Sequence, residues 1–350
     1  MGFFDAAGQD DADPGQGDDG ADERESLARI EAGGIPADAE RRLQGLGHEG
    51  SLFTSALSVN EFALLGRLGT RPLAQVMGAS VHHVGWQYLP LPAGYQSSPS
   101  LSIGGATLGG GLNDTIVSEL AMITQAWNQA RRRALDRLTE EARIVGADAV
   151  LGVRLERGEH DWASGSVDYL ISGTAVRFPG TEPPNWPLLT DVSVQDYWAL
   201  YQAGYDSLGL VATSAVVFVS PSTGTRLRRA ATVTKNQELE EITRGVFTAR
   251  DTARARLLGQ ARDASADGVV GMAFEQTMRE ESFKFEGYGL RGSGAGRFNP
   301  MTNTYDSGAA DIPERSGYVI TFHAAGTAVR LGVNEPRYPP ETVMRLEGVT

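Results

Sequence analysis

The sequence contains no cysteine, and this absence excludes several kinds of site. A chain without cysteine forms no disulfide and no thiolate site for zinc or an iron–sulfur cluster, so it needs no oxidising compartment. No apolar run reaches the roughly 18 residues that a membrane-spanning helix requires, so we expect no membrane span. The first residues lack the basic start and the apolar core of a signal peptide, and we therefore expect a cytoplasmic location.

Basic residues are nearly absent from the first 25 positions. Nine acidic residues stand there against Arg24 alone, a net charge of 1 − 9 = −8 out of −13 for the whole chain. An acidic, glycine-rich segment of this kind buries too little apolar surface to fold, so residues 1–25 are predicted to be a disordered tail. The same charge repels nucleic acid, and we expect no nucleic-acid partner.

The motifs of common enzymes are also missing. The chain has no Gly-x-Ser-x-Gly elbow, no His-Glu-x-x-His pair and no cysteine nucleophile. The glycine-rich stretch at 104–111 lacks both the Gly-Lys-Ser/Thr of a phosphate loop and the spacing of a dinucleotide-binding turn, so it is interpreted as a connector. We therefore expect a protein that is not an enzyme and that needs no resident cofactor.

What the sequence does contain is an internal repeat. Residues 142–156 (ARIVGADAVLGVRLE) recur at 261–275 (ARDASADGVVGMAFE), a shift of 261 − 142 = 119, with seven identical positions. Each copy predicts the end of a long helix, a tight turn and a returning strand. An apolar stripe with steps of three or four residues runs through 120–145 and again through 239–264, as expected for two long helices that each cover a sheet.

Shorter elements recur on either side of this repeat. Ser58 and Ser193 each begin a capping-box spacing, at a shift of 193 − 58 = 135, and thereby predict two short helices. Apolar strands follow at 73–81 and 208–216, and a third strand recurs at 167–177 and 320–330. The last shift is 320 − 167 = 153, which places an insertion of 153 − 119 = 34 residues in the second hairpin.

The repeat predicts an α+β fold with two tandem two-layer units, each a long helix on an antiparallel sheet of about three strands. A short helical hairpin, broken at Gly33–Gly34, precedes them. The expected segments are a disordered acidic tail (1–25), the helical hairpin (26–47), a first unit (52–179), a second unit (190–333) with a glycine-rich insertion near 286–315, and a C-terminal tail (334–350).

Three of these stretches resemble one known family. LAQVMGASV (73–81), GADAVLGVRLE (146–156) and SGTAVR (172–177), in the order strand, long helix and two strands, resemble the YbjQ-like family, small bacterial proteins labelled as putative heavy-metal-binding domains. The resemblance covers roughly 57–178 and again 192–331, which suggests a tandem duplication. It implies a two-layer fold that closes into a ring-shaped pentamer, and it brings no established activity.

Several local roles are expected from the pattern. Gly152 and Gly271 lie opposite the core face of their strands, where a missing side chain would permit close approach of another backbone. Glu119 and Glu238 are placed in the first turns of the two long helices, where the helix dipole favours an acid. The spacing of 234–237 predicts a capping box for the second long helix.

Metal binding has few residues to draw on, because the chain holds 5 histidines. The candidate ligands are His83, Glu156, His160 and Asp161, for a divalent transition metal at a hairpin or between subunits. His82 and His83 are adjacent on a predicted strand and point to opposite faces, so they cannot share one ion within a chain. Their repeat positions hold Val217 and Phe218, which favours a structural role for these histidines.

Two functions follow from these observations. The first is a non-enzymatic cytoplasmic assembly protein, in which repeated units self-associate into a ring. The alternative is a heavy-metal or small-ligand binding protein with sites at subunit junctions. The ligand, the number of subunits, the arrangement of the two repeats within one ring or in two stacked rings, and the roles of the acidic tail and glycine-rich loops are left open by the sequence.

Overall fold

The computed structural model describes most of the chain. The described residues are 16–46, 53–90, 101–103, 106–108, 115–159, 165–180, 182, 184–222, 224–226, 236–285, 297–299, 304–306 and 314–332. The predicted C-terminal tail (334–350) and most of the insertion at 286–315 lie outside them. Within the described ranges, no helix combines the length and apolarity needed to cross a membrane.

The first unit places one long helix on an antiparallel sheet. A short helix, α3 (Val59–Arg67), leads into β1 (Arg71–His83), and the long helix α4 (Ala121–Ile144) is followed by β5 (Ala149–Glu159) and β6 (Ser166–Arg177). The capping box predicted at Ser58 is present, because Ser58 Oγ accepts a hydrogen bond from the Glu61 amide while the Glu61 carboxylate accepts one from the Ser58 amide. The sheet order is β1-β6-β5-β7.

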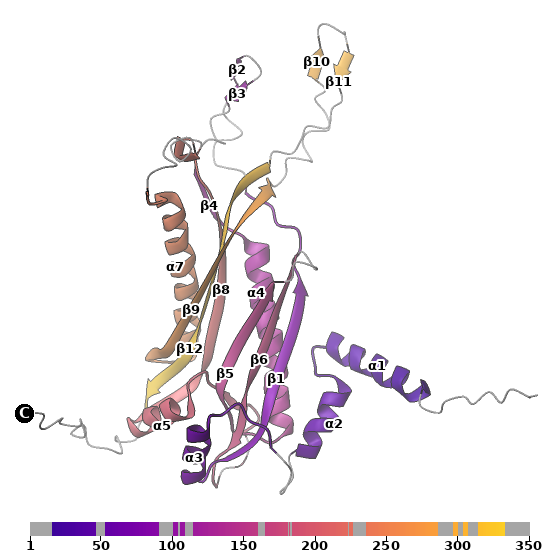
Figure 1. Ribbon diagram of the computed structural model, residues 1–350, viewed down its shortest axis with the longest axis vertical. Helices are drawn as coiled ribbons and strands as arrows, with labels where there is room; N and C mark the ends of the chain where they lie inside the picture. The colour runs from indigo at the N-terminus through magenta and orange to yellow at the C-terminus, as the bar shows by residue number, and fades with distance from the viewer. Residues whose placement is uncertain are drawn as a thin grey trace, which may run out of the picture.

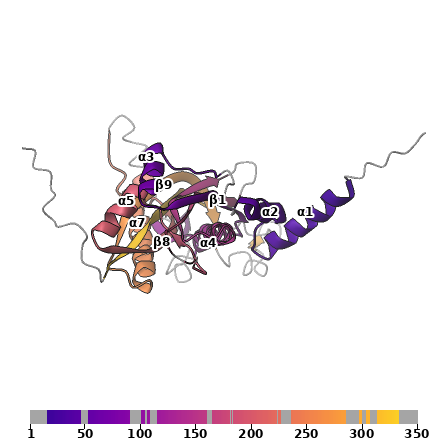
Figure 2. The ribbon, with the colours of Figure 1, turned by 90° about the horizontal axis from the view of Figure 1, so that it is seen from below.

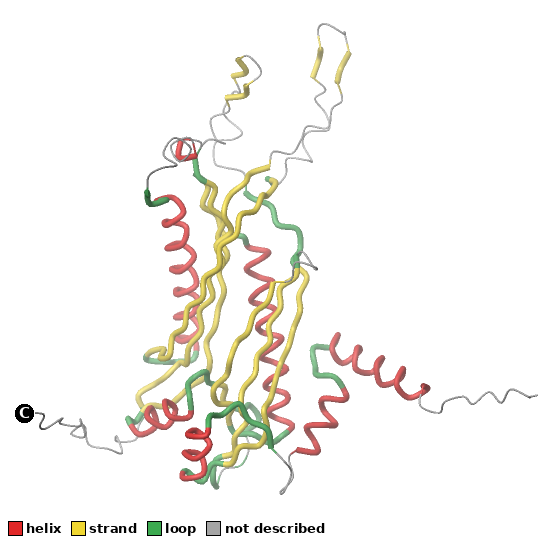
Figure 3. The backbone as a smooth tube through the Cα atoms, viewed as in Figure 1, coloured by secondary structure: helices red, strands yellow, loops and turns green. Residues whose placement is uncertain are grey.

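The second unit repeats this arrangement. It consists of α5 (Val194–Gln202), β8 (Tyr205–Ser220), α7 (Glu240–Asp263), β9 (Gly268–Lys284) and β12 (Glu314–Leu331), in the sheet order β4-β8-β12-β9. In both units the first strand pairs with the third, and the third pairs with the second. The α+β fold class is thereby confirmed, and the long helices run along the strands of both sheets (Figure 3).

The two sheets are not completed within their own units. β4 (Ile116–Glu119) precedes α4 in the first unit but pairs with β8 of the second, and β7 (Leu188–Leu189) from the linker pairs in parallel with β5. The predicted segments 52–179 and 190–333 therefore do not separate two self-contained domains. The sequence patterns mark elements, whereas strand pairing across such distances depends on tertiary packing.

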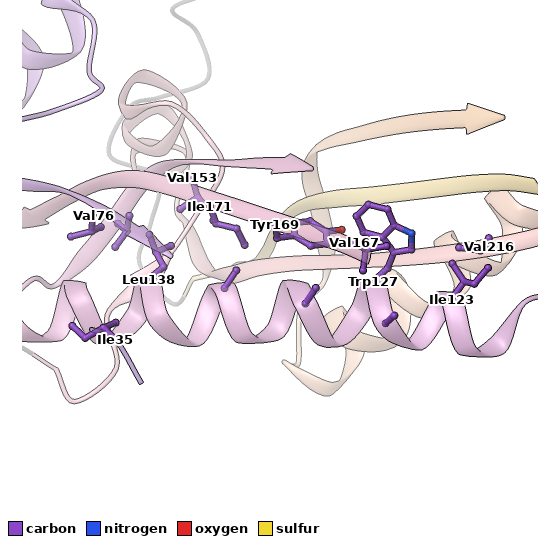
Figure 4. Close-up of a cluster of buried hydrophobic side chains, with 14 of the residues drawn as sticks. Ile35, Val76, Ile123, Trp127, Leu138, Val153, Val167, Tyr169, Ile171 and Val216 are labelled. Atoms are coloured by element: carbon purple, nitrogen blue, oxygen red, sulfur yellow. The ribbon is translucent and has the colours of Figure 1, made fainter. Parts of the chain in front are cut away.

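One apolar core joins the two units (Figure 4). Alanines along α4 allow the helix to lie close to β1 and β6, and Trp127 and Leu138 of the same helix are buried beside them. Val216 and Phe218 of β8 belong to this core as well. Seen from below, α4 lies beside both β1 and β8, whereas α7 lies on the far side of β8 (Figure 2).

The insertion in the second hairpin lengthens the strands beyond the units. β9 and β12 extend past their counterparts in the first unit, and β10 (Arg297–Asn299) pairs with β11 (Thr304–Asp306) between them (Figure 1). A similar short pair, β2 (Leu101–Ile103) and β3 (Ala106–Leu108), lies in the loop before α4.

The N-terminal prediction needs a correction. A helix, α1 (Gln16–Glu31), begins within the stretch predicted to be a disordered tail, and α2 (Ala37–Leu46) follows after the predicted break. Two acids of this stretch form ion pairs, since Asp22 pairs with Arg41 and Glu25 pairs with Arg29 one turn away. Residues 1–15 lie outside the described part of the chain.

Three local expectations are also wrong. Gly152 and Gly271 have φ values of +62° and +64° at irregularities in the ladders of β5 and β9, so glycine is required there by the backbone conformation rather than by close approach. Glu119 ends β4 and Glu238 precedes the cap of α7, so neither lies in a helix. Leu239 caps α7 without a side-chain hydrogen bond, so the helix begins beyond the predicted capping-box position at 234–237.

Candidate functional site at the junction of the two units

The junction is built where α4 meets the outer side of β8. Asn128 accepts a hydrogen bond from the Ser214 amide and donates one to the Ser214 carbonyl, both at 3.1 Å. One turn earlier, Thr124 Oγ1 accepts from the Val216 amide at 3.0 Å, and the Leu120 amide donates to the Val216 carbonyl at 2.8 Å. The helix and β4 therefore satisfy backbone groups of a strand that belongs to the other unit.

Beneath these contacts lies a buried polar cluster, defined here as Arg131, Tyr169, Ser214 and His323. Ser214 Oγ is 2.8 Å from His323 Nδ1 and 3.2 Å from the Tyr169 hydroxyl, and it accepts a hydrogen bond from Arg131 Nη1 at 3.3 Å. The indole of Trp127 meets the His323 ring edge-on, with the ring centroids 4.8 Å apart. Residues of α4, β6, β8 and β12 thus converge on one point.

The electrostatics of this cluster keep His323 neutral. Burial lowers the pKa of His323 to about 3, and the positive charges of Arg157 and Arg131 act in the same direction. Burial also lowers the pKa of Arg131, whose guanidinium donates to Asn128 Oδ1 at 2.7 Å. A neutral imidazole beside a charged guanidinium is a satisfied arrangement, which fixes the junction in one geometry.

The serine and histidine are close enough for proton transfer, but their surroundings do not suit catalysis. Ser214 is fully buried, and its hydroxyl already has His323, Tyr169 and Arg131 around it. A nucleophile needs a free approach for the substrate. The cluster therefore serves to hold the units together.

An open cavity of about 390 Å³ lies beside the cluster, between β5, β9 and β12. Its lining includes Arg154, Arg157, Asp191, Glu275 and His323. Arg157 forms an ion pair with Glu275, which links the two units directly. Burial raises the pKa of Asp191, and a hydrogen bond from the Thr327 hydroxyl opposes this effect. The cavity thus presents both signs of charge to whatever enters it.

A second, more apolar cavity of about 450 Å³ lies between the short helices α3 and α5. Aromatic side chains line much of it, and the rings of Trp198 and Tyr201 stack with their centroids 5.4 Å apart. Burial raises the pKa of Tyr197 in the same cavity.

The predicted metal ligands are only partly placed by the structure. His83 is exposed at the end of β1 opposite Ser166 of β6, whereas Glu156 is exposed on β5 opposite Leu170, four residues further along β6. His160 and Asp161 lie outside the described residues. Among the residues that can be described, no three histidine or acidic side chains gather as a metal site, and the predicted site stays a prediction.

The histidine pair fits its expected role in part. His82 is half-buried with its Nδ1 3.1 Å from Ser80 Oγ, and burial lowers its pKa, with Arg133 and Arg137 acting in the same direction. His83 is exposed, unlike Phe218 at its repeat position. At the repeat positions, Phe218 is buried against the first unit, whereas Val217 is buried in the apolar cluster of the second unit.

Sequence reasoning missed the polar cluster. Trp127 was recognisable in the apolar stripe of α4 and His323 in the third strand of the second unit, yet neither has an identical residue at the repeat position. Three of the four cluster residues also differ between the units, since only Arg131 recurs, as Arg250. The residues that join the two units differ from the residues at the equivalent repeat positions. A comparison that looks for residues shared by both repeats therefore does not find them.

The fold and the junction define the class of this protein: an α+β protein in which two helix-on-sheet units are joined by an apolar cluster that spans their junction. A known protein family matches part of the first of these units. Residues 102–179 match the YbjQ family, described as putative heavy-metal-binding. This match covers β5, β6 and α4.

Relatives place the chain more closely. It is 31% identical over 234 residues to the encapsulin nanocompartment protein Rv1762c of Mycobacterium tuberculosis, a match that covers 65% of this chain and 80% of that protein. It is also 36% identical over 72 residues to a UPF0145 protein of Enterococcus faecalis and 47% identical over 58 residues to UPF0145 protein OE_4416R of Halobacterium salinarum. The chain covers 66% and 54% of these two proteins. No solved structure matches.

The chain therefore belongs to the family of the mycobacterial encapsulin nanocompartment protein, and it contains a YbjQ-like domain.

Proposed function

We propose that this protein is a non-enzymatic scaffold whose copies self-associate into a closed, ring-like assembly. The observation that carries the proposal is the exposure of large apolar side chains on both units. Met77 and Val81 of β1 are 43% and 66% exposed, and Phe247 of α7 and Phe274 of β9 are 49% and 48% exposed. Apolar side chains gathered on regular elements are typical of protein–protein contacts.

The family relationship supports the same proposal. One relative is named as an encapsulin nanocompartment protein, and a role in an assembly is in keeping with that name. Long strands with an unpaired edge are a further reason to expect a partner, because an edge strand offers a row of backbone groups to a neighbouring chain. β1 and β9 are edge strands of their sheets in the part of the chain that the structure describes.

We also infer that the two units arose by duplication of one YbjQ-like module. Both long helices contain 24 residues at a shift of 119, and both sheets connect their three long strands in the same order. A protein with two similar units per chain would build a ring from half as many chains as units.

Native mass spectrometry and multi-angle light scattering test the proposal. The purified chain at micromolar concentration should give a discrete mass that is a multiple of the monomer, and negative-stain micrographs should show closed particles. A monomer throughout this concentration range would overturn the proposal.

A second candidate function is small-ligand binding in the cavity at the junction. Its support is the lining of that cavity by Arg154, Arg157, Asp191 and Glu275, which could hold a small polar molecule. A thermal-shift screen of small carboxylates and amines tests this candidate. A rise in Tm that is abolished by Arg154→Ala would support it, and a flat screen would count against it.

A further inference from the structure

We infer that a second copy docks head-to-tail, with the outer face of its first sheet against α7 and β9 of the first copy, in the same way that the second sheet packs on the first unit within one chain. This inference rests on the proposed self-association and specifies its interface. Equivalent positions of the two units are related by the shifts of 119 and 135 residues.

The junction within the chain supplies the template. On β8, the outward side chains of Ala212 and Val216 are 6% and 0% exposed, and Ser214 between them is fully buried. On α4, Arg131 is 7% exposed against them, and Asn128 bonds the backbone of Ser214. One unit thus offers a helix face, and the next offers the outer face of its first strand.

The equivalent row on β1 has no cover in the described chain. Met77 stands where Ala212 stands, 77 + 135 = 212, and it is 43% exposed; Val81 stands where Val216 stands and is 66% exposed. Ala79, at the position of Ser214, is exposed as well. The same row of one strand is therefore buried in the second unit and open in the first.

The equivalent face of α7 is also open. Phe247 occupies the position of Asn128, 128 + 119 = 247, and is 49% exposed. Arg250 occupies the position of the buried Arg131, and its guanidinium lies over the Phe247 ring at 4.7 Å from the centroid. On β9, exposed Phe274 stands at the position of Leu155, which packs against the joint core. The second unit thus lacks the neighbour that the first unit has.

The two open faces suit each other chemically. Phe247 and Phe274 offer aromatic surface, and Met77 and Val81 offer a flexible and a branched aliphatic side chain of matching apolarity. At the junction within one chain, Asn128 hydrogen-bonds to the backbone of a strand. In the proposed contact between two copies, Phe247 would cover aliphatic side chains instead, so that contact would be less polar. A second copy of this chain is the partner that carries the other half of the interface in the required orientation.

The strand pairing extends the same way. β4 pairs with β8 through Glu119 and Val217, and the equivalent segment before α7 is residues 235–238. Residues 236–238 form no strand in the structure. We expect them to pair with the end of β1 of the neighbouring copy near His82, in the register set by β4 and β8.

A contact of this kind joins two different surfaces, so it cannot close as a two-fold dimer. Head-to-tail contacts generate a ring when the rotation per subunit closes, and a filament when it does not. Each copy would add two units, so the ring holds an even number of units.

Two charge substitutions test the faces separately. Phe247→Asp removes the α7 face and leaves β1 intact, whereas Val81→Asp removes the β1 face and leaves α7 intact. Each variant alone should be monomeric by light scattering. Mixed in equal amounts, they should form a 1:1 dimer and nothing larger, because a single intact pair of faces remains. Val59→Asp, an equally drastic change at a position that is 84% exposed on α3, should assemble as the wild type does.

A crosslink provides a readout that does not depend on disrupting the fold. Because the chain contains no cysteine, Thr243→Cys with Val81→Cys introduces the only thiols. Within one chain, the equivalent pair Thr124 and Val216 is in hydrogen-bond contact. Oxidation of the double variant should give a ladder of covalent oligomers on a non-reducing gel, and neither single variant should.

The outcomes separate the inference from the proposed function. A wild-type chain that is monomeric would overturn both. A wild-type chain that assembles, with both aspartate variants assembling normally and no ladder in the cysteine pair, would overturn the docking mode and leave the scaffold proposal standing. A dimer from either single cysteine variant would indicate a two-fold contact and would also overturn the head-to-tail mode.

Discussion

Asn128 of α4 bonds both backbone groups of Ser214 on β8, accepting from its amide and donating to its carbonyl at 3.1 Å each. A side-chain amide in this position acts as one residue of a neighbouring strand. It does so across 86 residues of sequence and between the two units. The relationship shows that the edge of the second sheet is completed by the helix of the first.

Asn128→Ala should therefore weaken the whole chain. The substitution leaves the buried Ser214 amide without its acceptor and removes one acceptor of the Arg131 guanidinium, which costs about 2–3 kcal/mol of unfolding free energy. Urea unfolding at a fixed protein concentration measures this change. Gln125→Ala, on the exposed side of the same helix, is the matched control and should stay within about 0.5 kcal/mol of the wild type. Equal effects of the two substitutions would contradict the role of Asn128.

The neutral His323 makes stability depend on pH. Its pKa is about 3 in the folded chain against 6.5 for an unperturbed histidine. Below pH 6.5 the unfolded chain binds a proton that the folded chain does not, so this contribution is present above 6.5 and is lost as the pH falls toward 3. The slope approaches about 1.4 kcal/mol per pH unit.

His323→Asn retains a polar group near Ser214 and removes the titration. The stability difference between wild type and variant, measured by urea unfolding, should shrink by about 2 kcal/mol between pH 7 and pH 5. Parallel curves for the two proteins would show that the histidine is charged, or exposed, in the folded state.

The two left-handed glycines should not tolerate a side chain. Gly152→Ala or Gly271→Ala places a Cβ on a backbone with φ above +60°, which costs about 1–2 kcal/mol. Gly259→Ala is the same change in the interior of α7, with no atom within 4 Å of the new Cβ, and should stabilise the chain by about 0.5–1 kcal/mol. Thermal unfolding checks the opposite signs. A gain in stability at position 152 or 271 would contradict the assignment of these backbones.

The apolar cluster and the polar contacts that cross the junction predict that the two units unfold together. Leu138 of α4 and Leu257 of α7 are both fully buried at equivalent positions, 138 + 119 = 257, Leu138 in the cluster that spans the junction and Leu257 in the cluster of the second unit. Replacing either by alanine should cost about 2–5 kcal/mol and should shift one common transition in calorimetry. A separate early transition in Leu257→Ala, with the rest of the chain melting as in the wild type, would show that the units are independent.

The long helices were predictable because their signal is local. The apolar stripes at 120–145 and 239–264 agree within one residue at each end with α4 and α7. A stripe records which side of a helix is buried, and alanines at its centre record a close approach to a sheet. The caps at Ser58 and Ser193 were equally local and are confirmed.

The junction was not predictable from the same patterns. Nothing in residues 116–119 indicates that their partner is β8, about a hundred positions further along, rather than a strand of their own unit. Asn128 and Phe247 stand at equivalent positions with opposite chemistry, because one meets the neighbouring unit in the chain and the other faces outward. The candidate metal residues His83 and Glu156 illustrate the same limit. Their sequence neighbourhoods do not indicate that β6 lies between their strands, β1 and β5.

The pairing of β4 with β8 has a consequence for folding during synthesis of the chain. Glu119 leaves the ribosome 217 − 119 = 98 residues before Val217, the residue that it pairs with. During that interval, about 5–20 s at the usual rate of synthesis, β8 is not yet available to pair with β4 or to pack against α4. A nascent chain halted near residue 180 would expose apolar surface that is buried in the complete protein, and it should therefore bind chaperones.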